Sequence, residues 1–459
     1  MSAATLLGIA IGAIIVLLFL VIQVKMSAFV AILLVATGTA LATGIPVEEI
    51  VPVLQQGMGN TLGSVMIVVG LGAMLGRVIE VAGGADSLAH SFTRMLGEKR
   101  VIAAVTAAAF VLGIPIFFDV GFIILAPIVF GFARVANINP LKIGLPVGGA
   151  LLTVHVALPP HPGPVAAAEI IGADIGMMLA IGLPISAVTA VVGYMTAKLI
   201  RTESISLLDS PAMKAENLGA AEEVKAAYNS VATRVKSIGA GTVMLLILLP
   251  ILQIMMGTVG NMMLEEGSTA QRWLSMIGSS AIALLTGVIV AYLVVGKKMG
   301  WSLEKRGSVL DSALPDVAVI VFVTGAGGVF ANVLVQSGIG GALADSLVAL
   351  NMPIILAGFL ISAALRASQG SATVAILTSA GLMSEPIAAA GYSNIQAVLV
   401  TLAIAFGGLG LSHINDSGFW IVTKYLGLSV KDGLRTWTVL TTVLGVVGFL
   451  LTWLVFAFV

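Results

Sequence analysis

Long apolar runs alternate with short polar segments along the whole chain, and most of the runs are long enough to cross a membrane as a helix. About 20 helical residues span a hydrocarbon core of about 30 Å. The runs are rich in Leu, Ile, Val, Ala and Gly and lack the alternation of barrel strands, so helices are predicted. The pattern predicts ten crossings, at about residues 3–24, 28–45, 61–82, 143–165, 174–198, 238–260, 273–296, 315–336, 395–422 and 436–458.

Two other apolar stretches, 101–133 and 353–383, are too long for one crossing and are interrupted internally. The first interruption runs from Gly113 to Asp119, and the second from Arg366 to Ser371. Glycine, proline and polar residues of this kind end helices. We interpret both stretches as re-entrant hairpins, which enter and leave the membrane on the same side.

Composition excludes several classes of protein. Of the 459 residues, 59% are hydrophobic and 10% are charged, whereas charged residues make up about 25% of soluble domains. The net charge is zero, which gives no electrostatic basis for binding nucleic acid. The absence of cysteine excludes disulfides, thiolate nucleophiles and Fe–S clusters. The first apolar run has no basic region before it, so it is expected to stay in the chain as a span.

The positions of Lys and Arg predict the orientation. These residues concentrate in cytoplasmic loops, and nearly all of the 22 fall on one side of the ten-crossing layout if both termini lie outside. The one long polar segment, about 201–236, then lies inside. We predict that it is a cytoplasmic linker between an N-terminal half, 1–200, and a C-terminal half, 237–459.

An internal repeat supports this division into halves. The Gly-x-Gly pattern at 70–72 recurs at 325–327, and Val78 recurs as Val333, at a constant offset of 255. Ten crossings divide into five and five, and an odd number of crossings per half inverts the second half. We therefore predict an all-α polytopic membrane protein with two inverted-topology repeats of five spans, each with a re-entrant hairpin and an interrupted helix. This architecture is typical of secondary transporters.

Four polar interruptions are predicted to form the substrate site: the two hairpin tips and the segments 155–164 and 413–419. The run 159–164 contains four prolines and is not expected to be helical. Broken helices leave backbone groups for a ligand, and a helix that resumes presents N–H groups to an anionic oxygen. The candidate substrate-binding residues are Asp119, Gly121, Thr153, His155, His161, Gly163, Ser368, Gln369, Gly370, Ser371, Thr373, Asn415, Asp416 and Ser417.

Ionisable residues within the membrane are costly and are functional hypotheses by default. Asp119 lies among phenylalanines, where desolvation favours a neutral acid and hence proton exchange; the alternative is a carboxylate bonded to backbone N–H groups at the hairpin tip. Asp416 is either a proton carrier or a helix N-cap. His155, His161 and His413 either relay protons or are buried neutral rings bonded to carbonyls.

Two arginines at membrane depth have different expected roles. Arg366 is expected to pair with a substrate carboxylate, to pair with an acid of the chain, or to snorkel to the interface. Arg77 and Glu80 are three residues apart on one predicted helix and are expected to pair with each other. No residue spacing of a metal site is present, so no metal and no cofactor are expected.

Four longer motifs strongly resemble the gluconate permease family of bacterial proton symporters. They are Phe117 to Leu125, Thr153 to Pro164, Gln369 to Ala375 and Gly407 to Trp420, and the resemblance extends over essentially the whole chain. It implies a carrier in the bacterial cytoplasmic membrane that imports gluconate or a related sugar acid with protons, within a superfamily of inverted repeats. Relatives often have Glu where this chain has Asp119.

The resulting hypothesis is proton symport of gluconate by alternating access, in which a unit that contains both hairpins slides against a scaffold. A homodimer is expected, because such carriers commonly need a partner subunit as scaffold. The alternative substrates are D-serine, glycerate or a uronate. A membrane-embedded enzyme and a channel are more distant alternatives, because neither a catalytic metal spacing nor a selectivity filter is present.

Overall fold

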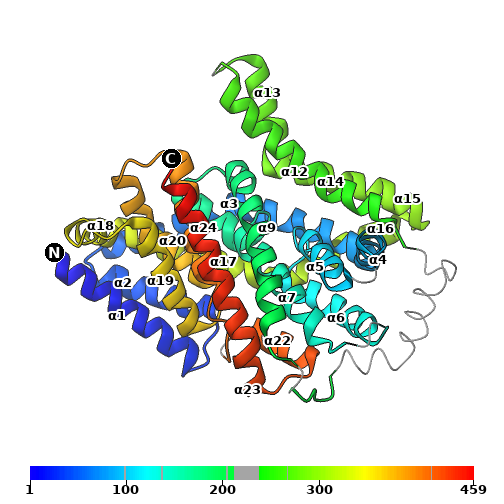
Figure 1. The fold of residues 1–459 in the computed structure, drawn as a ribbon. Coiled ribbons are helices and arrows are strands. Elements are labelled where there is room, and N and C mark those ends of the chain that lie inside the picture. The colour runs from blue at the N-terminus through cyan, green and yellow to red at the C-terminus, as the bar shows by residue number, and fades with distance from the viewer. Residues whose placement is uncertain (98–99, 136–137, 203–204, 211–236, 266, 415) are drawn as a thin grey trace.

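The computed structural model describes residues 1–97, 100–135, 138–202, 205–210, 237–265, 267–414 and 416–459. Within these ranges the regular structure is entirely helical, and no strand occurs. Most of the predicted linker, from residue 211 to residue 236, lies outside the described residues. Figure 1 shows the helices packed into one body, with the N-terminus at its left side and the C-terminus at its upper edge.

The helices of the first half are α1 (Ala3–Ile22), α2 (Ala28–Ala42), α3 (Val47–Val81), α4 (Gly84–Leu96), α5 (Val101–Leu112), α6 (Phe118–Val135), α7 (Leu141–Ala157), α8 (Pro162–Ile171) and α9 (Ile175–Leu199). Those of the second half are α12 (Ala240–Met263), α13 (Thr269–Gly278), α14 (Ser280–Val290), η3 (Ala291–Val295), α15 (Gly296–Met299), α16 (Leu303–Asp311), α17 (Leu314–Gln336), α18 (Ile339–Ala349), α19 (Ile354–Gln369), α20 (Ala372–Ala389), α21 (Asn394–Leu409), α22 (Ser417–Leu426), α23 (Val430–Gly433), η4 (Leu434–Thr438) and α24 (Val439–Phe456).

Nine helices in the described part of the chain are long and apolar enough to cross a membrane. Eight of them coincide with predicted crossings, and the ninth, α20, belongs to the second predicted hairpin. The predicted crossings at 28–45 and 395–422 contain the shorter apolar helices α2 and α21. These lengths and compositions establish a multi-pass membrane protein, while the orientation of the termini stays a prediction.

Both predicted hairpin stretches consist of two helices with a short break. Residues 113–117 separate α5 from α6, and residues 370–371 separate α19 from α20. The second stretch ends at Ala389 rather than at 383. Whether each pair re-enters the membrane on one side stays a prediction.

Several boundary predictions are wrong. The crossing predicted at 61–82 is part of the longer helix α3, which begins at Val47. The span predicted at 273–296 begins at Ser280, because the extended backbone of Ser279 separates it from the short amphipathic helix α13. The run 159–164 is only partly non-helical: Pro162 begins α8, and Gly163 and Pro164 lie in its first turn. Proline is favoured at the first helical position, where its missing N–H would have no partner within the helix.

The same order of elements occurs in both halves. Helix α4 begins at residue 84 and α18 begins at residue 339. The helices that follow, α5, α6, α7 and α8, correspond in order to α19, α20, α21 and α22, and α9 corresponds to the continuous helical run from α23 to α24. Both α8 and α22 are ten residues long and begin at residues 162 and 417, which differ by 255. The offset found in the sequence therefore holds for the helices.

Helices of the two halves pack against each other around the breaks. The long helix α3 packs on α17, α6 packs on α22, and α20 packs on α8. Small residues permit the close approach: Gly57 on α3 faces the backbone of Gly328 on α17, where an added Cβ would lie 2.7 Å from the Gly328 carbonyl oxygen. Packing between the halves thus brings the hairpin of each half next to the interrupted helix of the other.

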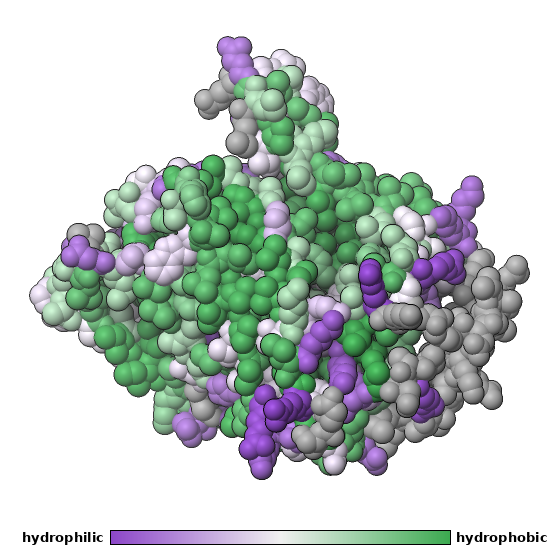
Figure 2. Space-filling model, in the orientation of Figure 1, coloured by the Kyte–Doolittle hydropathy of each residue, from purple (hydrophilic) through white to green (hydrophobic). Residues whose placement is uncertain are grey.

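The surface of the body has the character of a lipid-facing protein. Figure 2 shows hydrophobic side chains over the middle of this face, with hydrophilic ones along its lower edge. The end of α12 and the helix α13 project from the body as an arm (Figure 1). Exposed apolar side chains of this arm include Met263, Trp273 and Met276.

Candidate functional site

The second-half break is held by a buried ion pair. Arg366, in the last turn of α19, is 1% exposed, and its Nη2 lies 2.5 Å from Oδ2 of Asp416. Asp416 is the N-cap of α22, and its Oδ1 accepts a hydrogen bond from the N–H of Gly418 at 3.0 Å. The cap and the acid-pairing alternatives for these two residues are therefore both confirmed. Removal of one partner from such a pair typically costs about 3–5 kcal/mol.

A hydrogen-bond network that includes Ser412 and two residues of η4 also holds the Asp416 carboxylate in place. The hydroxyl of Ser412 donates to Oδ2 of Asp416. Ser412 in turn accepts from Trp437 Nε1 at 2.8 Å, and its carbonyl accepts from Thr438 Oγ1 at 2.6 Å. Ser412 and Trp437 were missed in the sequence, because neither is ionisable and Trp437 is 25 residues away. Only the hydroxyl within the resembling motif could have indicated Ser412.

Two histidines occupy the first-half break. His161 is the N-cap residue of α8, and its Nε2 lies 2.7 Å from the carbonyl oxygen of Gly113, at the end of α5. Its Nδ1 lies 3.1 Å from Nδ1 of His155. With both rings neutral, His161 must donate through Nε2 and accept through Nδ1. His155 then donates through Nδ1, so its Nε2 is an acceptor, and no hydrogen bond from a described residue reaches it.

Equivalent positions tie each break to the hairpin of its own half. Adding 255 to 161 gives 416, so His161 and Asp416 both stand at the N-cap position of the resuming helix, although only the side chain of Asp416 accepts a capping hydrogen bond. His161 binds the end of α5, whereas Asp416 binds Arg366 near the end of α19. His413 adds a second tie, from its Nε2 to the carbonyl of Ala367 at 2.7 Å. The same backbone position therefore carries an imidazole in one half and a carboxylate in the other.

The four helix starts around the breaks lie in two close pairs. A Cβ added at Gly163 in α8 would lie 3.7 Å from Cα of Thr373 in α20. A Cβ added at Gly418 in α22 would lie 3.1 Å from Cε1 of Phe118 in α6. Both contacts join a resuming helix to the hairpin of the opposite half, and adding 255 to 118 and 163 gives 373 and 418. Each pair thus brings together helix N-termini from the two halves.

Asp119 lies in the first turn of α6 and is exposed. Phe117, Phe118 and Phe122 are its neighbours in sequence, and their rings pack against other partners. Phe118 and Phe122 are one turn apart and share a buried helix face, where Phe118 stacks on Trp437 with 5.9 Å between ring centroids. Phe117 instead packs against the two histidines. Asp119 nevertheless lies within electrostatic range of Asp416 and Arg366, so it belongs to the same group of charges.

Several of the smaller polar residues predicted for the site use their hydroxyl groups within the protein and are not free to bind a ligand. Thr153 is buried and donates to the carbonyl of Gly149 in its own helix at 2.7 Å, and Ser368 donates in the same way to Ala364. Ser371 caps α20 by accepting from Val374. Such bonds to the backbone of the residue's own helix or cap leave few donors for a ligand.

The remaining predicted residues are placed as follows: Gly121 is buried against α7, Gly370 ends α19 with a left-handed φ of 84°, Gln369 is the last residue of α19, Ser417 is exposed at the start of α22, and Asn415 lies outside the described residues.

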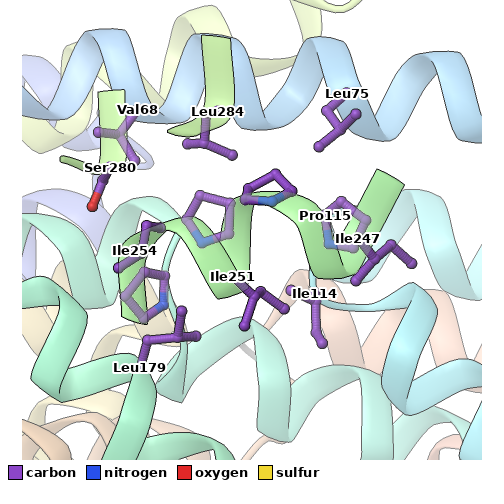
Figure 3. A pocket seen from close by; sticks show the side chains of 13 residues that line it. Val68, Leu75, Ile114, Pro115, Leu179, Ile247, Ile251, Ile254, Ser280 and Leu284 are labelled. Atoms are coloured by element: carbon purple, nitrogen blue, oxygen red, sulfur yellow. The ribbon is translucent and has the colours of Figure 1, made fainter. Parts of the chain in front are cut away.

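An apolar pocket lies beside the first-half break (Figure 3). Its lining includes Pro115, Pro159 and Pro160 from the breaks and Ile251 from α12. Ser280 is the only lining residue with a polar side chain, and no lining residue is charged. This pocket therefore does not suit a hydrophilic anion. The described residues also contain no group of three His, Asp or Glu side chains that could hold a metal ion.

The chain is similar to membrane permeases over its whole length. The model of the GntP family permease matches residues 4–459. The inner membrane permease YgbN of Escherichia coli K12 is 55% identical over 457 residues, which cover 100% of both chains. The gluconate permease of Pseudomonas aeruginosa is 36% identical and covers 94% of this chain and 93% of its own. The L-idonate transporter of the Gnt-II system of E. coli K12 is 32% identical, with 95% of both chains covered.

Solved structures support the fold. MtrF of Neisseria gonorrhoeae, described within a class of antimetabolite efflux pumps, has a TM-score of 0.61 at 15% identity and covers 89% of this chain and 84% of its own. The YdaH transporter of Alcanivorax borkumensis has a TM-score of 0.59 at 14% identity and covers 94% and 97%. At these identities the likeness concerns the helix arrangement alone.

Proposed function

This chain belongs to the GntP family of permeases, and we propose that it imports gluconate or a closely related sugar acid together with protons. The observation that carries the proposal is the buried ion pair of Arg366 and Asp416 at the start of α22, with Asp119 in electrostatic range of both. A cationic guanidinium and helix N-termini suit a carboxylate. The acceptor Nε2 of His155 and the exposed Ser417 suit the hydroxyls of a polyol.

The charges of the site support coupling to protons. Arg366, Asp416 and Asp119 together carry a charge of −1 when both acids are ionised, and a bound monoanion would make it −2. Two like charges about 4 Å apart at an effective dielectric constant of about 20 repel by about 4 kcal/mol. Uptake of a proton by Asp119 or Asp416 removes this penalty. Binding of the anion and binding of the proton therefore favour each other.

We further propose that the two halves have inverted topology and that transport follows an elevator mechanism. The 255-residue offset between equivalent helices supports two related halves. The hairpin helices α6 and α20, which pack on α22 and α8 of the opposite half, would form one moving unit with the breaks. The remaining helices would form the scaffold, and both termini would lie outside.

A homodimer that associates through the arm is part of this proposal. The arm projects from the body (Figure 1), and Trp273 and Met276 on α13 are 60% and 48% exposed. Because the chain has no cysteine, a single cysteine at position 276 (Met276→Cys) can be cross-linked without background. Cross-linked dimers in native membranes are expected for this variant and not for Leu34→Cys, which lies exposed on α2. Equal cross-linking of both variants would contradict an interface at the arm.

The function is tested by uptake of labelled gluconate into proteoliposomes, with and without an inward proton gradient. Gradient-driven accumulation is expected for the wild type, and it should be lost in at least one of Asp119→Asn and Asp416→Asn. Glu48→Gln, which changes an exposed acid in the first turn of α3, is the matched control. Gradient-independent uptake by the wild type would contradict symport. Competition by unlabelled L-idonate, D-serine, glycerate and a uronate separates the possible substrates.

A further inference from the structure

The guanidinium of Arg366 is buried with one donor unused. Its Nη1 donates to the carbonyl of Gly370, and its Nη2 donates to Oδ2 of Asp416. Its Nε is buried and has no hydrogen-bond partner among the described residues. Nε and Nη2 point to the same side of a guanidinium and form the fork that holds both oxygens of a carboxylate. Only half of this fork is used.

Asp416 cannot fill the fork because its second oxygen has another partner. Oδ1 accepts from the N–H of Gly418, and Oδ2 is shared between Arg366 and the hydroxyl of Ser412. The carboxylate is thus tied to the start of α22 and to Ser412, and it reaches Arg366 with one oxygen only. A free carboxylate without these ties could bind Nε and Nη2 together.

We infer that Asp416 occupies the place of the substrate's carboxylate in the empty carrier, and that protonation of Asp416 frees Arg366 to hold the sugar acid through Nε and Nη2. This inference rests on the proposed function and assigns its proton carrier and its anion site. The proton that binds Asp416 stays on that carboxyl while the substrate is bound. Before binding, the guanidinium of Arg366 is paired with the carboxylate of Asp416. After one anion and one proton have entered, it is paired with the substrate's carboxylate, so this pair still carries one positive and one negative charge.

Other titratable groups surround Asp416 and must be separated from it. Asp119 approaches from α6, His155 from α7 lies within electrostatic range of Arg366, and His413 lies in the same break. Asp119 is the main competitor, because it is a carboxylate in the same group of charges and is exposed. The two carboxylates differ in that, among the described residues, Asp416 alone forms an ion pair with the guanidinium.

The test measures proton uptake when gluconate binds to the purified full-length protein, by titration calorimetry in buffers of different ionisation enthalpy. Wild type and Asp119→Asn are expected to take up one proton per gluconate, and Asp416→Asn none. Because one proton binds with each gluconate, the gluconate affinity of the wild type should fall by up to about tenfold per pH unit as the pH rises, while that of Asp416→Asn stays constant. Asp416→Asn should also exchange gluconate across the membrane but not accumulate it.

Several outcomes would overturn the inference. Loss of proton uptake in Asp119→Asn would assign the proton to Asp119, and this result decides the question even if Asp416→Asn fails to fold. Competition by gluconamide, which lacks the carboxylate, as strong as that by gluconate would remove Arg366 as the anion site. The failure of the proposed function is distinct: gluconate would then not bind the wild type at any pH.

Discussion

Gly163→Ala and Gly418→Ala form a matched pair of substitutions at equivalent positions in the first turns of α8 and α22. A Cβ at Gly163 would meet Ile376 Cδ1 at 3.5 Å, which is an ordinary contact with a flexible side chain. A Cβ at Gly418 would meet Phe118 at 3.1 Å. Phe118 is 3% exposed and stacked between Phe122 and Trp437, so its ring has no space to move away. We expect Gly418→Ala to be the less stable variant.

The expected difference in stability between the two variants follows from the one energy term that does not cancel between them. Replacing glycine in a helix by alanine gains up to about 1 kcal/mol of helix propensity at both positions, so this term drops out of the comparison. Overpacking a tight contact costs about 1–3 kcal/mol, and it applies only at Gly418. If the contact is released in the transition state for unfolding, Gly418→Ala should inactivate about 5- to 150-fold faster than Gly163→Ala at one temperature.

The assay is the half-life of folded, monodisperse protein in detergent at a fixed elevated temperature. A rate is the appropriate measure because large proteins commonly unfold irreversibly. Gly38→Ala serves as a control, because nothing lies within 4 Å of its added Cβ. Equal half-lives of the Gly163 and Gly418 variants, or a shorter half-life for Gly163→Ala, would refute the packing described around Phe118.

Three further substitutions test other parts of the site. Thr153→Val should leave the gluconate affinity within about twofold, because the hydroxyl bonds to its own helix; a loss of tenfold or more in a binding assay would restore the sequence-based role. His161→Ala should lower stability by about 1–3 kcal/mol, because the buried Gly113 carbonyl loses its donor, and an unchanged thermal half-life would contradict that bond. Glu80→Gln should change stability by less than about 1 kcal/mol, because ion pairs three residues apart on one helix contribute about 0.2–0.5 kcal/mol; a marked loss of gluconate uptake would instead place the pair in the transport pathway.

The interruptions of the helices could be predicted from the sequence, because they depend on local chemistry. Glycine, proline and polar residues in apolar runs end helices. Three of the breaks lie within the predicted segments, and the fourth, at 410–416, begins three residues before the predicted 413–419. The pairing of Arg77 with Glu80 is local in the same sense and is confirmed at 2.9 Å. The proline run was less predictable, since Pro162 begins a helix and does not prevent one.

Partners far apart in the chain could not be fixed from the sequence. Arg366 had three possible roles, and only packing of α22 beside the end of α19 selects Asp416 as its partner. The exposure of Asp119 depends on Phe118 and Phe122 finding Trp437 as a neighbour. Thr153 was assigned to the site by its place in a motif, although its bond to Gly149 is local. Tertiary packing decides the first two cases, and competition from the backbone decides the third.

His161 and Asp416 stand at equivalent N-cap positions, and the difference between them affects the orientation of the proposed substrate. The end at Asp416 adjoins a buried cation, whereas the end at His161 offers uncharged rings and aromatic edges from Phe117. A sugar acid, which has a carboxylate at one end and hydroxyls along its length, is therefore expected to bind in one orientation, with its carboxylate toward Arg366. The imidazole at position 161 and the carboxylate at position 416 therefore make the two ends of the proposed site chemically unlike.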